Sequence, residues 1–206
     1  TLNVIMTSMS AFLLTRKSFA IKNFLAYMMI FTMYFSGGLI PTYLVVFNVL
    51  GLGDSLGALI LPTLISVYNV IIMRSNFAAI PQGLEESARI DGANEFVIFS
   101  RIIMPLSMPI IAVMILFYGV NHWNSWFNAM IYLRTREKYP LQLVLREILL
   151  SGTADQMAGS SGADQYALGE SVKYATIIVA TVPILAIYPF IQKYFVKGIM
   201  VGAIKG

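Results

Sequence analysis

Residues 102–133 read IIMPLSMPIIAVMILFYGVNHWNSWFNAMIYL, a run of 32 residues without a charged side chain. A helix needs about 20 mostly apolar residues to cross the hydrocarbon core of a bilayer. Inside that core every backbone polar group has to be hydrogen-bonded within the protein, and a helix achieves this in a single segment. The run is continuous and does not alternate between polar and apolar residues. It therefore predicts a membrane-spanning helix and not a strand of a membrane barrel.

Three further runs without charge, 23–53, 55–73 and 174–192, extend this prediction to the whole chain. Charged residues make up 12% of the 206 residues, about half of what a soluble domain carries, and 58% are hydrophobic. We expect an all-α, polytopic transmembrane helical bundle that forms one domain over residues 1–206. Five spans are predicted, at about Leu2–Leu14, Phe24–Phe47, Leu56–Met73, Phe96–Val120 and Tyr174–Tyr194.

Several of these spans contain residues that interrupt helices. Gly37-Gly38 lies in the second span, where we expect a kink or a break. Prolines inside the spans predict either ordinary kinks or broken helices that let a bundle rock between two states. These are Pro62, Pro105, Pro109 and Pro183. Because the sequence begins at Thr1 within an apolar segment, we also expect a sixth span upstream.

The basic residues predict the orientation, because loops on the cytoplasmic side carry an excess of Lys and Arg. Alternating spans place nine of the 14 basic residues on one side: Arg16, Lys17, Lys22, Arg74, Arg89, Arg101, Lys193, Lys197 and Lys205. That side is predicted to be cytoplasmic. Residues 134–172 are then an extracytoplasmic loop with a Gly/Ser-rich centre, Ser151–Gly162, which is expected either to contact a binding protein or to be disordered.

The stretch from Pro81 to Glu95 is the only charged, amphipathic segment between two spans. Pro81 suits the first position of a helix, and Gly92 suits the left-handed residue that follows its end. A helix this short is not stable alone in water and has to dock against a surface. Its acidic residues match anionic lipid poorly, so the groove of a partner protein is favoured over the membrane interface.

Residues 80–93, IPQGLEESARIDGA, carry a family resemblance. Glu86-Ser87-Ala88, Gly92 and Ile102 through Pro105 resemble the "EAA…G…I-LP" signature of permease subunits of ATP-driven (ABC) importers. The longer match resembles the carbohydrate branch of that family, as do WNSW at 123–126, YPLQ at 139–142 and QKYFVKG at 192–198. The departures, Ser87 for Ala and Met104 for Leu, are mild. The resemblance covers the chain and implies the transmembrane domain of a type I importer.

This resemblance implies a permease subunit of an oligosaccharide importer, multi-pass in the inner (cytoplasmic) membrane of a bacterium. Its partners would be a second, homologous permease in a heterodimer, two ATPase subunits, an extracytoplasmic solute-binding protein and membrane lipid. The chain would hold no cofactor, because ATP and Mg are used by the ATPase. Residues 80–95 would be the coupling helix, which lies in a groove of the ATPase. The residues implied in that contact are Glu85, Glu86, Ala88, Asp91 and Gly92. The alternative is an interfacial loop helix without a coupling role.

Amides and aromatic residues gather after the fourth span, between Asn121 and Asn128. Aromatic faces stack on sugar rings and amides hydrogen-bond to hydroxyl groups, so this cluster is a candidate for the sugar path near the outer leaflet. The residues concerned are Asn121, Trp123, Asn124, Trp126 and Asn128. An aromatic belt at the membrane surface explains the two Trp residues equally well. His122 is expected to have a structural role.

Other functional classes fit the sequence less well. Without Cys and with one His, the chain lacks the residues for a thiolate nucleophile or a histidine metal site, and it has no GxxxxGK[ST] phosphate loop for ATP. An enzyme is therefore not expected. The net charge of +4 does not indicate a nucleic-acid partner either, because basic residues in a membrane chain report topology first. An ion-coupled secondary transporter of small polar solutes is the main alternative, although the uncharged runs contain no intramembrane carboxylate for a coupling ion. A channel is not excluded, but nothing resembles a repeated selectivity filter.

Overall fold

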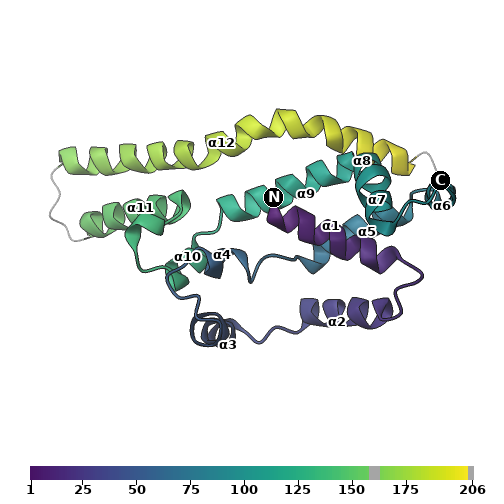
Figure 1. Ribbon diagram of the computed structural model, residues 1–206. Helices are drawn as coiled ribbons and strands as arrows, with labels where there is room; N and C mark the ends of the chain where they lie inside the picture. Colours follow the sequence, from purple (N-terminus) through teal and green to yellow (C-terminus); the bar gives the residue numbers. More distant parts are fainter. Residues whose placement is uncertain (158–162, 204–206) are drawn as a thin grey trace. The chain divides into compact units, whose positions relative to one another are not determined.

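The computed structural model describes the backbone of residues 1–157 and 163–203, and the side chains of 1–151, 170–189 and 192. Within these ranges the regular structure is entirely helical (Figure 1). The first half of the chain contains α1 (Leu2–Thr15), α2 (Lys22–Tyr34), α3 (Leu39–Leu44), the π-helical η1 (Val45–Val49), α4 (Gly57–Ile60), α5 (Val67–Ala78) and α6 (Gln82–Ile90). The second half contains α7 (Glu95–Val97), the π-helical η2 (Ile98–Ile103), α8 (Met104–Leu106), α9 (Met108–Trp123), α10 (Phe127–Tyr132), the 3-10 turn η3 (Arg136–Lys138), α11 (Leu141–Met157) and α12 (Ala163–Ala203).

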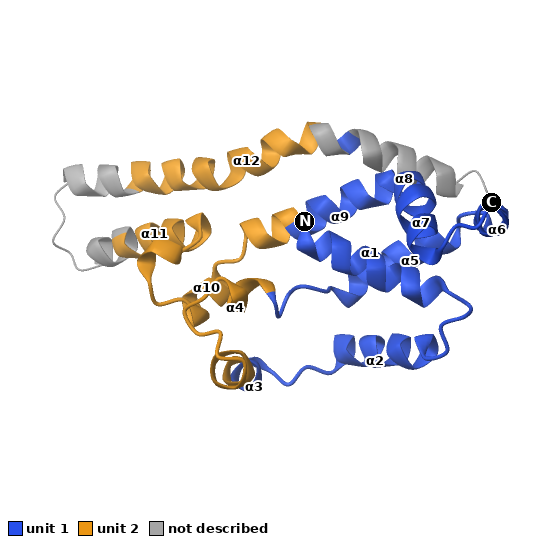
Figure 2. Ribbon diagram, viewed as in Figure 1, with its two compact units in different colours: residues 1–42, 61–118, 191–206 blue, residues 43–60, 119–190 orange. Residues whose placement is uncertain are grey.

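The chain forms two compact units (Figure 2). The first combines residues 1–42, 61–118 and 191–206. The second combines residues 43–60 and 119–190. Each unit combines segments that are distant in the sequence. Each unit also has hydrophobic core residues of its own.

Helix α1 packs along α5 in the core of the first unit. Thr7, Ser8 and Ala11 of α1 are fully buried, and they recur at the spacing of one helix face. Small side chains at such an interface let two helix backbones approach closely, which is how helices associate where lipid removes the hydrophobic driving force. Larger residues complete this core, including Phe12, Met73, Ile98 and Met114.

The predicted third span, Leu56–Met73, is not one helix. The structure has two helices here, α4 and α5, separated by residues 61–66 around Pro62. The polar groups of this break are satisfied by other helices, because the Asn3 amide donates to the carbonyl of Thr63 at 2.9 Å and the Tyr118 hydroxyl accepts the N–H of Ser66 at 3.1 Å. A proline break within a membrane segment is tolerated under this condition.

Two other predicted spans are bent. The second is broken as expected at Gly37-Gly38, with 117° between Lys22–Tyr34 and Leu39–Val49, and Gly38 has a φ of +85°. The fourth turns by 83° between Glu95–Leu106 and Met108–Trp123.

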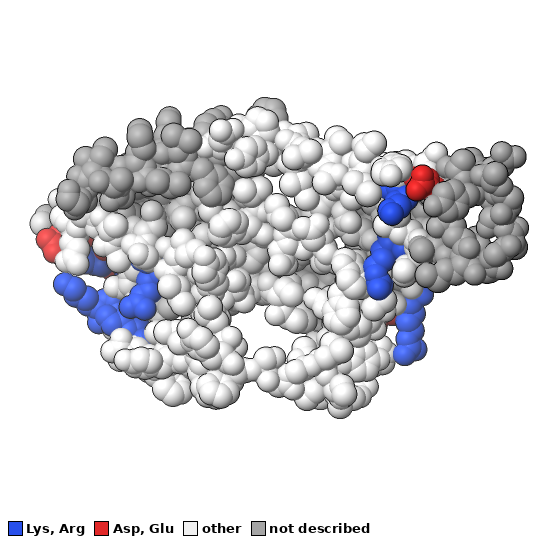
Figure 3. All heavy atoms as spheres, turned by 180° about the vertical axis from the view of Figure 1, so that it is seen from behind, with Lys and Arg blue, Asp and Glu red and all other residues white. Residues whose placement is uncertain are grey.

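The number of continuous spans is smaller than the five predicted. Among the described residues, one helix segment, Glu170–Pro189, is long and apolar enough to cross a membrane, and there are up to three spans if each bent pair counts as one. Helix α1 is apolar but shorter. Most of the described surface seen in Figure 3 carries no charge. Tyr27, Ile40 and Leu185 are among the exposed large apolar residues of the described part of the chain.

In the second unit, part of residues 134–172, which the sequence predicted to be a surface loop, is helical. Residues 141–157 form α11, and α12 begins at Ala163. The polar composition of this segment did not predict α11, whose apolar residues Leu143 and Leu145 are buried. The Gly/Ser-rich residues 158–162 lie outside the described residues.

Asp54 joins two loops of this unit. It adopts a left-handed conformation with φ +52°, and its carboxylate accepts the N–H groups of Arg134 at 2.9 Å and Thr135 at 3.0 Å. The Thr135 hydroxyl, at 2.5 Å, and the Lys138 ammonium, at 3.0 Å, also donate to it. The hydrogen bonds from Thr135 are the largest cause, followed by those from Arg134 and Lys138, and together they hold the pKa of Asp54 well below its usual range.

We expect Asp54→Asn to lower the melting temperature of the purified protein at pH 7 by at least about 2 °C. Because the pKa of Asp54 is lower in the folded state, its contribution to stability is fully present above about pH 4 and is lost as the pH falls below that value. The difference between wild type and variant should therefore be constant from pH 7 to pH 5 and shrink towards pH 3. Glu137→Gln, at an exposed acid on the neighbouring turn, is the control. A difference in melting temperature that stays the same from pH 7 to pH 3 contradicts a lowered pKa of Asp54.

Candidate functional site

Helix α6 has a well-defined end. The N–H of Gly92 donates to the carbonyl of Arg89 at 3.0 Å, and the N–H of Ala93 donates to that of Ala88 at 2.9 Å. This pair of bonds is a Schellman motif, which needs a residue in the left-handed region. Gly92 has a φ of +81°, as the sequence predicted, so any side chain there strains the backbone even though no atom blocks it. Pro81 lies one residue before the first helical residue.

The inner face of α6 is fixed to the end of α1 by a buried ion pair. The Arg16 guanidinium makes two hydrogen bonds to the Glu85 carboxylate, the longer at 2.7 Å between Nη2 and Oε1. The two side chains are only 9% and 11% exposed. The guanidinium also lies 4.1 Å from the ring centroid of Phe12. A bidentate pair of this kind sets orientation as well as distance.

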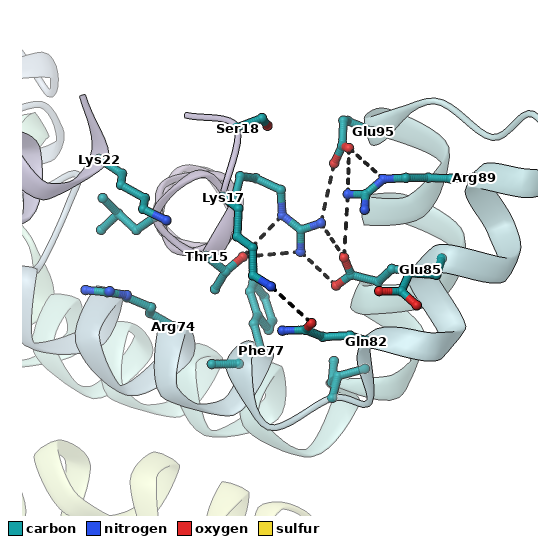
Figure 4. A pocket seen from close by; sticks show the side chains of 15 residues that line it. Thr15, Lys17, Ser18, Lys22, Arg74, Phe77, Gln82, Glu85, Arg89 and Glu95 are labelled. Carbon is teal, nitrogen blue, oxygen red and sulfur yellow. Dashed lines mark hydrogen bonds and ion pairs between the residues drawn. The ribbon is translucent and has the colours of Figure 1, made fainter. Parts of the chain in front are cut away.

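Two further charges complete the network, as Figure 4 shows. Glu95, at the start of α7, lies 3.4 Å from Arg16 and 2.8 Å from Arg89. Arg89 is in turn 3.8 Å from Glu85, one helical turn away. Four charged groups thus hold α1, α6 and α7 together in the first unit.

The five residues predicted to contact an ATPase divide between two sides of α6. Glu85 is buried in the ion network, and Ala88 is half-buried against the core. Glu86, Asp91 and Gly92 are exposed. Within the part of the chain that the structure describes, neither Glu86 nor Asp91 forms an ion pair or a side-chain hydrogen bond. The carboxylate of Glu85 is therefore used within this chain, while those of Glu86 and Asp91 are available to a partner.

Sequence reasoning did not single out Arg16 as a site residue. It was counted only as a basic residue on the predicted cytoplasmic side. The signal was its position directly after the first apolar segment, but its partner Glu85 is 69 residues away, and no spacing rule connects the two.

The predicted sugar-path residues lie in the second unit, where both Trp side chains have partners. The indole N–H of Trp123 donates to the carbonyl of Ala180 at 3.0 Å. The Arg146 guanidinium lies over the ring of Trp126, 3.9 Å from its centroid, a contact that sequence reasoning missed. Asn121 and Asn124 are exposed and Asn128 is half-buried. The structure thus leaves the amides of Asn121 and Asn124 more accessible than the two Trp rings.

Among the residues with described positions, no group of three or more His, Asp or Glu side chains is placed to hold a metal ion. The chemistry that the α6 region offers is the presentation of carboxylates in the middle (Glu86) and at the end (Asp91) of an anchored helix.

Comparison with known proteins decides the family. The model of the binding-protein-dependent transport system inner membrane component family matches residues 3–201. The chain belongs to this family. The permease is therefore a transport component in a membrane and not an enzyme, and the ion-coupled secondary transporter that the sequence left open is not the family that matches.

Named relatives agree with this assignment. Over 206 residues the permease is 45% identical to the polygalacturonan/rhamnogalacturonan transport system permease protein YtcP of Bacillus subtilis, covering 99% of this chain and 71% of that protein. Protein LplC of the same organism is 46% identical over 185 residues, covering 90% of this chain and 62% of LplC. The permease thus spans less than two thirds of LplC.

A solved structure shares the fold. The crystal structure of a bacterial ABC transporter involved in the import of the acidic polysaccharide alginate superimposes with a TM-score of 0.76 at 29% identity, covering 94% of this chain and 73% of that one. The prediction of a helical ABC importer permease is confirmed by this match and by the family.

Proposed function

We propose that this permease forms half of the translocation path of an ATP-driven oligosaccharide importer and that α6 is its contact with an ATPase subunit. The division of α6 into two sides supports this proposal. Glu85 anchors the helix, whereas the carboxylates of Glu86 and Asp91 are exposed and form no ion pair among the described residues. A helix that transmits force needs both features, a rigid attachment to its own subunit and a free surface for the other.

The ion network suggests how movement would travel through this unit. A displacement of α6 acts on Glu85, and the bidentate pair passes it to Arg16 at the end of α1. Helix α1 packs along α5 through small residues, which permit close contact between the two backbones. Alternating access in this proposal begins with a displacement of α1 by α6.

The remaining parts of the importer are a second, homologous permease in a heterodimer, two ATPase subunits that use ATP and Mg, and an extracytoplasmic solute-binding protein. The assembly would lie in the bacterial cell membrane. In this arrangement α6 is cytoplasmic and residues 134–172 are on the outer side, where the segment around Ser151–Gly162 would meet the binding protein.

For the cargo we propose an oligosaccharide derived from an acidic polysaccharide. The support comes from two similar proteins, the polygalacturonan/rhamnogalacturonan permease and the alginate transporter. Asn121, Trp123, Asn124, Trp126 and Asn128 are the proposed path residues. The exposure of Asn121 and Asn124 leaves their amides free to hydrogen-bond to sugar hydroxyls. The aromatic-belt role remains an alternative for the two Trp residues.

Uptake by the complete importer, reconstituted in liposomes with its binding protein, tests the cargo. We expect ATP-dependent accumulation of oligogalacturonides and at least about tenfold less of neutral maltooligosaccharides of equal length. A tenfold preference corresponds to about 1.4 kcal/mol, the scale of one charge-assisted hydrogen bond. Preferential uptake of the neutral sugar would overturn the acidic assignment. Uptake that does not depend on ATP would overturn the proposal of an ATP-driven importer.

A further inference from the structure

A cavity of about 470 Å³ lies in the first unit, beside the ion network (Figure 4). It is bordered by the end of α1, the start of α2, the last turns of α5 and the first turns of α6. Eight of its lining residues are charged, five basic and three acidic: Arg16, Lys17, Lys22, Arg74, Arg89, Glu85, Glu86 and Glu95. The cavity therefore carries an excess of positive charge.

The charges are not evenly matched across the cavity. Beside α6, Arg16 and Arg89 neutralise Glu85 and Glu95, and Glu86 is the one lining acid that forms no ion pair among the described residues. The other three cations are Lys17, Lys22 and Arg74; Figure 4 shows Lys22 and Arg74 on the side away from the network and Lys17 between them and α6. In the described part of the chain, no carboxylate lies within ion-pair distance of any of these three, and Lys17 contacts only the neutral side chain of Gln82, at 3.4 Å.

Half-burial makes this arrangement costly for the free protein. Lys22 and Arg74 are both partly covered, so water solvates them less well than it solvates a surface cation. Basic residues that flank membrane spans serve orientation, but that role requires neither a shared cavity nor partial burial. An anionic group inside the cavity would offset both the repulsion and the lost solvation. A phosphate is well suited, because it has several oxygens that accept charge-assisted hydrogen bonds from Lys and Arg side chains.

The surroundings favour a lipid phosphate over a soluble one. Helix α2 begins at Lys22, and the residues next to it expose large apolar side chains: Ile21 is 55% exposed, Phe24 67% and Met28 53%. An amphiphile could place its headgroup in the cavity and its acyl chains along α2. Basic pockets on the cytoplasmic side of membrane proteins bind anionic headgroups in this way.

We propose that Lys17, Lys22 and Arg74 bind the phosphate of an anionic phospholipid. The proposal uses the membrane location of the family and the proposed cytoplasmic position of α6, and it is tested separately from the ATPase contact and the cargo. The same cavity is closed on its far side by the Arg16–Glu85 pair, so the lipid would lie next to the anchor of α6.

Binding of spin-labelled phosphatidylglycerol to the complete transporter in phosphatidylcholine nanodiscs tests the site. We expect the wild type to prefer phosphatidylglycerol over labelled phosphatidylcholine, and Lys22→Gln/Arg74→Gln to weaken this preference at least about fivefold, because each cation near the surface contributes appreciably to anionic lipid binding. Arg136→Gln/Lys173→Gln removes the same charge from exposed positions of the second unit and should leave the preference unchanged. Lys22→Arg/Arg74→Lys should retain it.

Equal melting temperatures in pure phosphatidylcholine discs show that the variants are folded, and the single variants Lys22→Gln and Arg74→Gln, each expected to weaken the preference, replace the double variant if it is not. A wild type without preference, or a preference that survives Lys22→Gln/Arg74→Gln, overturns the proposal. Competition with inorganic phosphate distinguishes a site for a lipid phosphate from a site for free phosphate. If millimolar inorganic phosphate displaces the labelled lipid completely, the cavity is a site for free phosphate and the lipid assignment is wrong.

Discussion

Arg16→Ala is expected to lower the free energy of unfolding of the purified permease by about 3–5 kcal/mol, because it leaves the buried carboxylate of Glu85 without its partner. In detergent this corresponds to a fall in melting temperature of about 6 °C or more. The same change removes the tie between α1 and α6, so assembly with the ATPase should fall as well. Melting curves and co-purification of the complex measure the two effects.

Substitutions of Glu85, the acidic partner of Arg16, and of its neighbour Glu86 form a matched comparison. Glu85→Gln should destabilise the protein, whereas Glu86→Gln, at the neighbouring exposed position, should change its stability by less than about 0.5 kcal/mol. The double variant Arg16→Met/Glu85→Leu should recover much of the loss, because replacing a buried pair by apolar residues is often close to neutral. Equal effects of Glu85→Gln and Glu86→Gln would contradict the buried network.

Glu86→Lys/Asp91→Lys is expected to reduce ATP-dependent uptake by the complete importer at least about 100-fold. Both side chains are exposed, so the permease itself should fold normally. In the proposed contact these carboxylates pair with basic groups of the ATPase, so reversing both charges replaces attraction by repulsion that costs several kcal/mol, and each 1.4 kcal/mol is a factor of ten in binding. Uptake into liposomes and recovery of the ATPase with the permease are the measurements.

The control for this change is Glu137→Lys/Glu170→Lys. It makes the same change in net charge at two exposed acids of the second unit and should leave uptake within about twofold of wild type. A complex that assembles and transports normally with lysine at both positions of α6 would show that this surface does not meet the ATPase.

Features set by local sequence were predicted well. The end of α6 at Gly92 and the break at Gly37-Gly38 both follow from residues that permit a positive φ, and the structure has both. The apolar segments were also recognised, because lack of charge is visible in any window of the sequence. What these signals could not give was the length of each continuous helix.

Features that depend on distant partners were not predicted. The break at residues 61–66 persists because Asn3 and Tyr118 satisfy its polar groups, and neither is close to it in the sequence. The same holds for Arg16 and Glu85, whose burial changes Glu85 from an expected partner contact into an internal anchor. Helix α11 was missed because its polar residues suggested a loop, while its buried leucines become evident only when Leu143 packs against Ala129 and Leu133.

Site-specific cross-linking tests most directly whether α6 meets the ATPase. The chain contains no cysteine, so a single cysteine can be introduced without removing others. With a short thiol-reactive cross-linker in the complete importer, Glu86→Cys and Asp91→Cys are predicted to join the permease to the ATPase subunit, with yields that change when ATP binds. Glu137→Cys, equally exposed, is predicted to give no such product. Cross-links to the ATPase from position 137 and none from 86 or 91 would contradict the account.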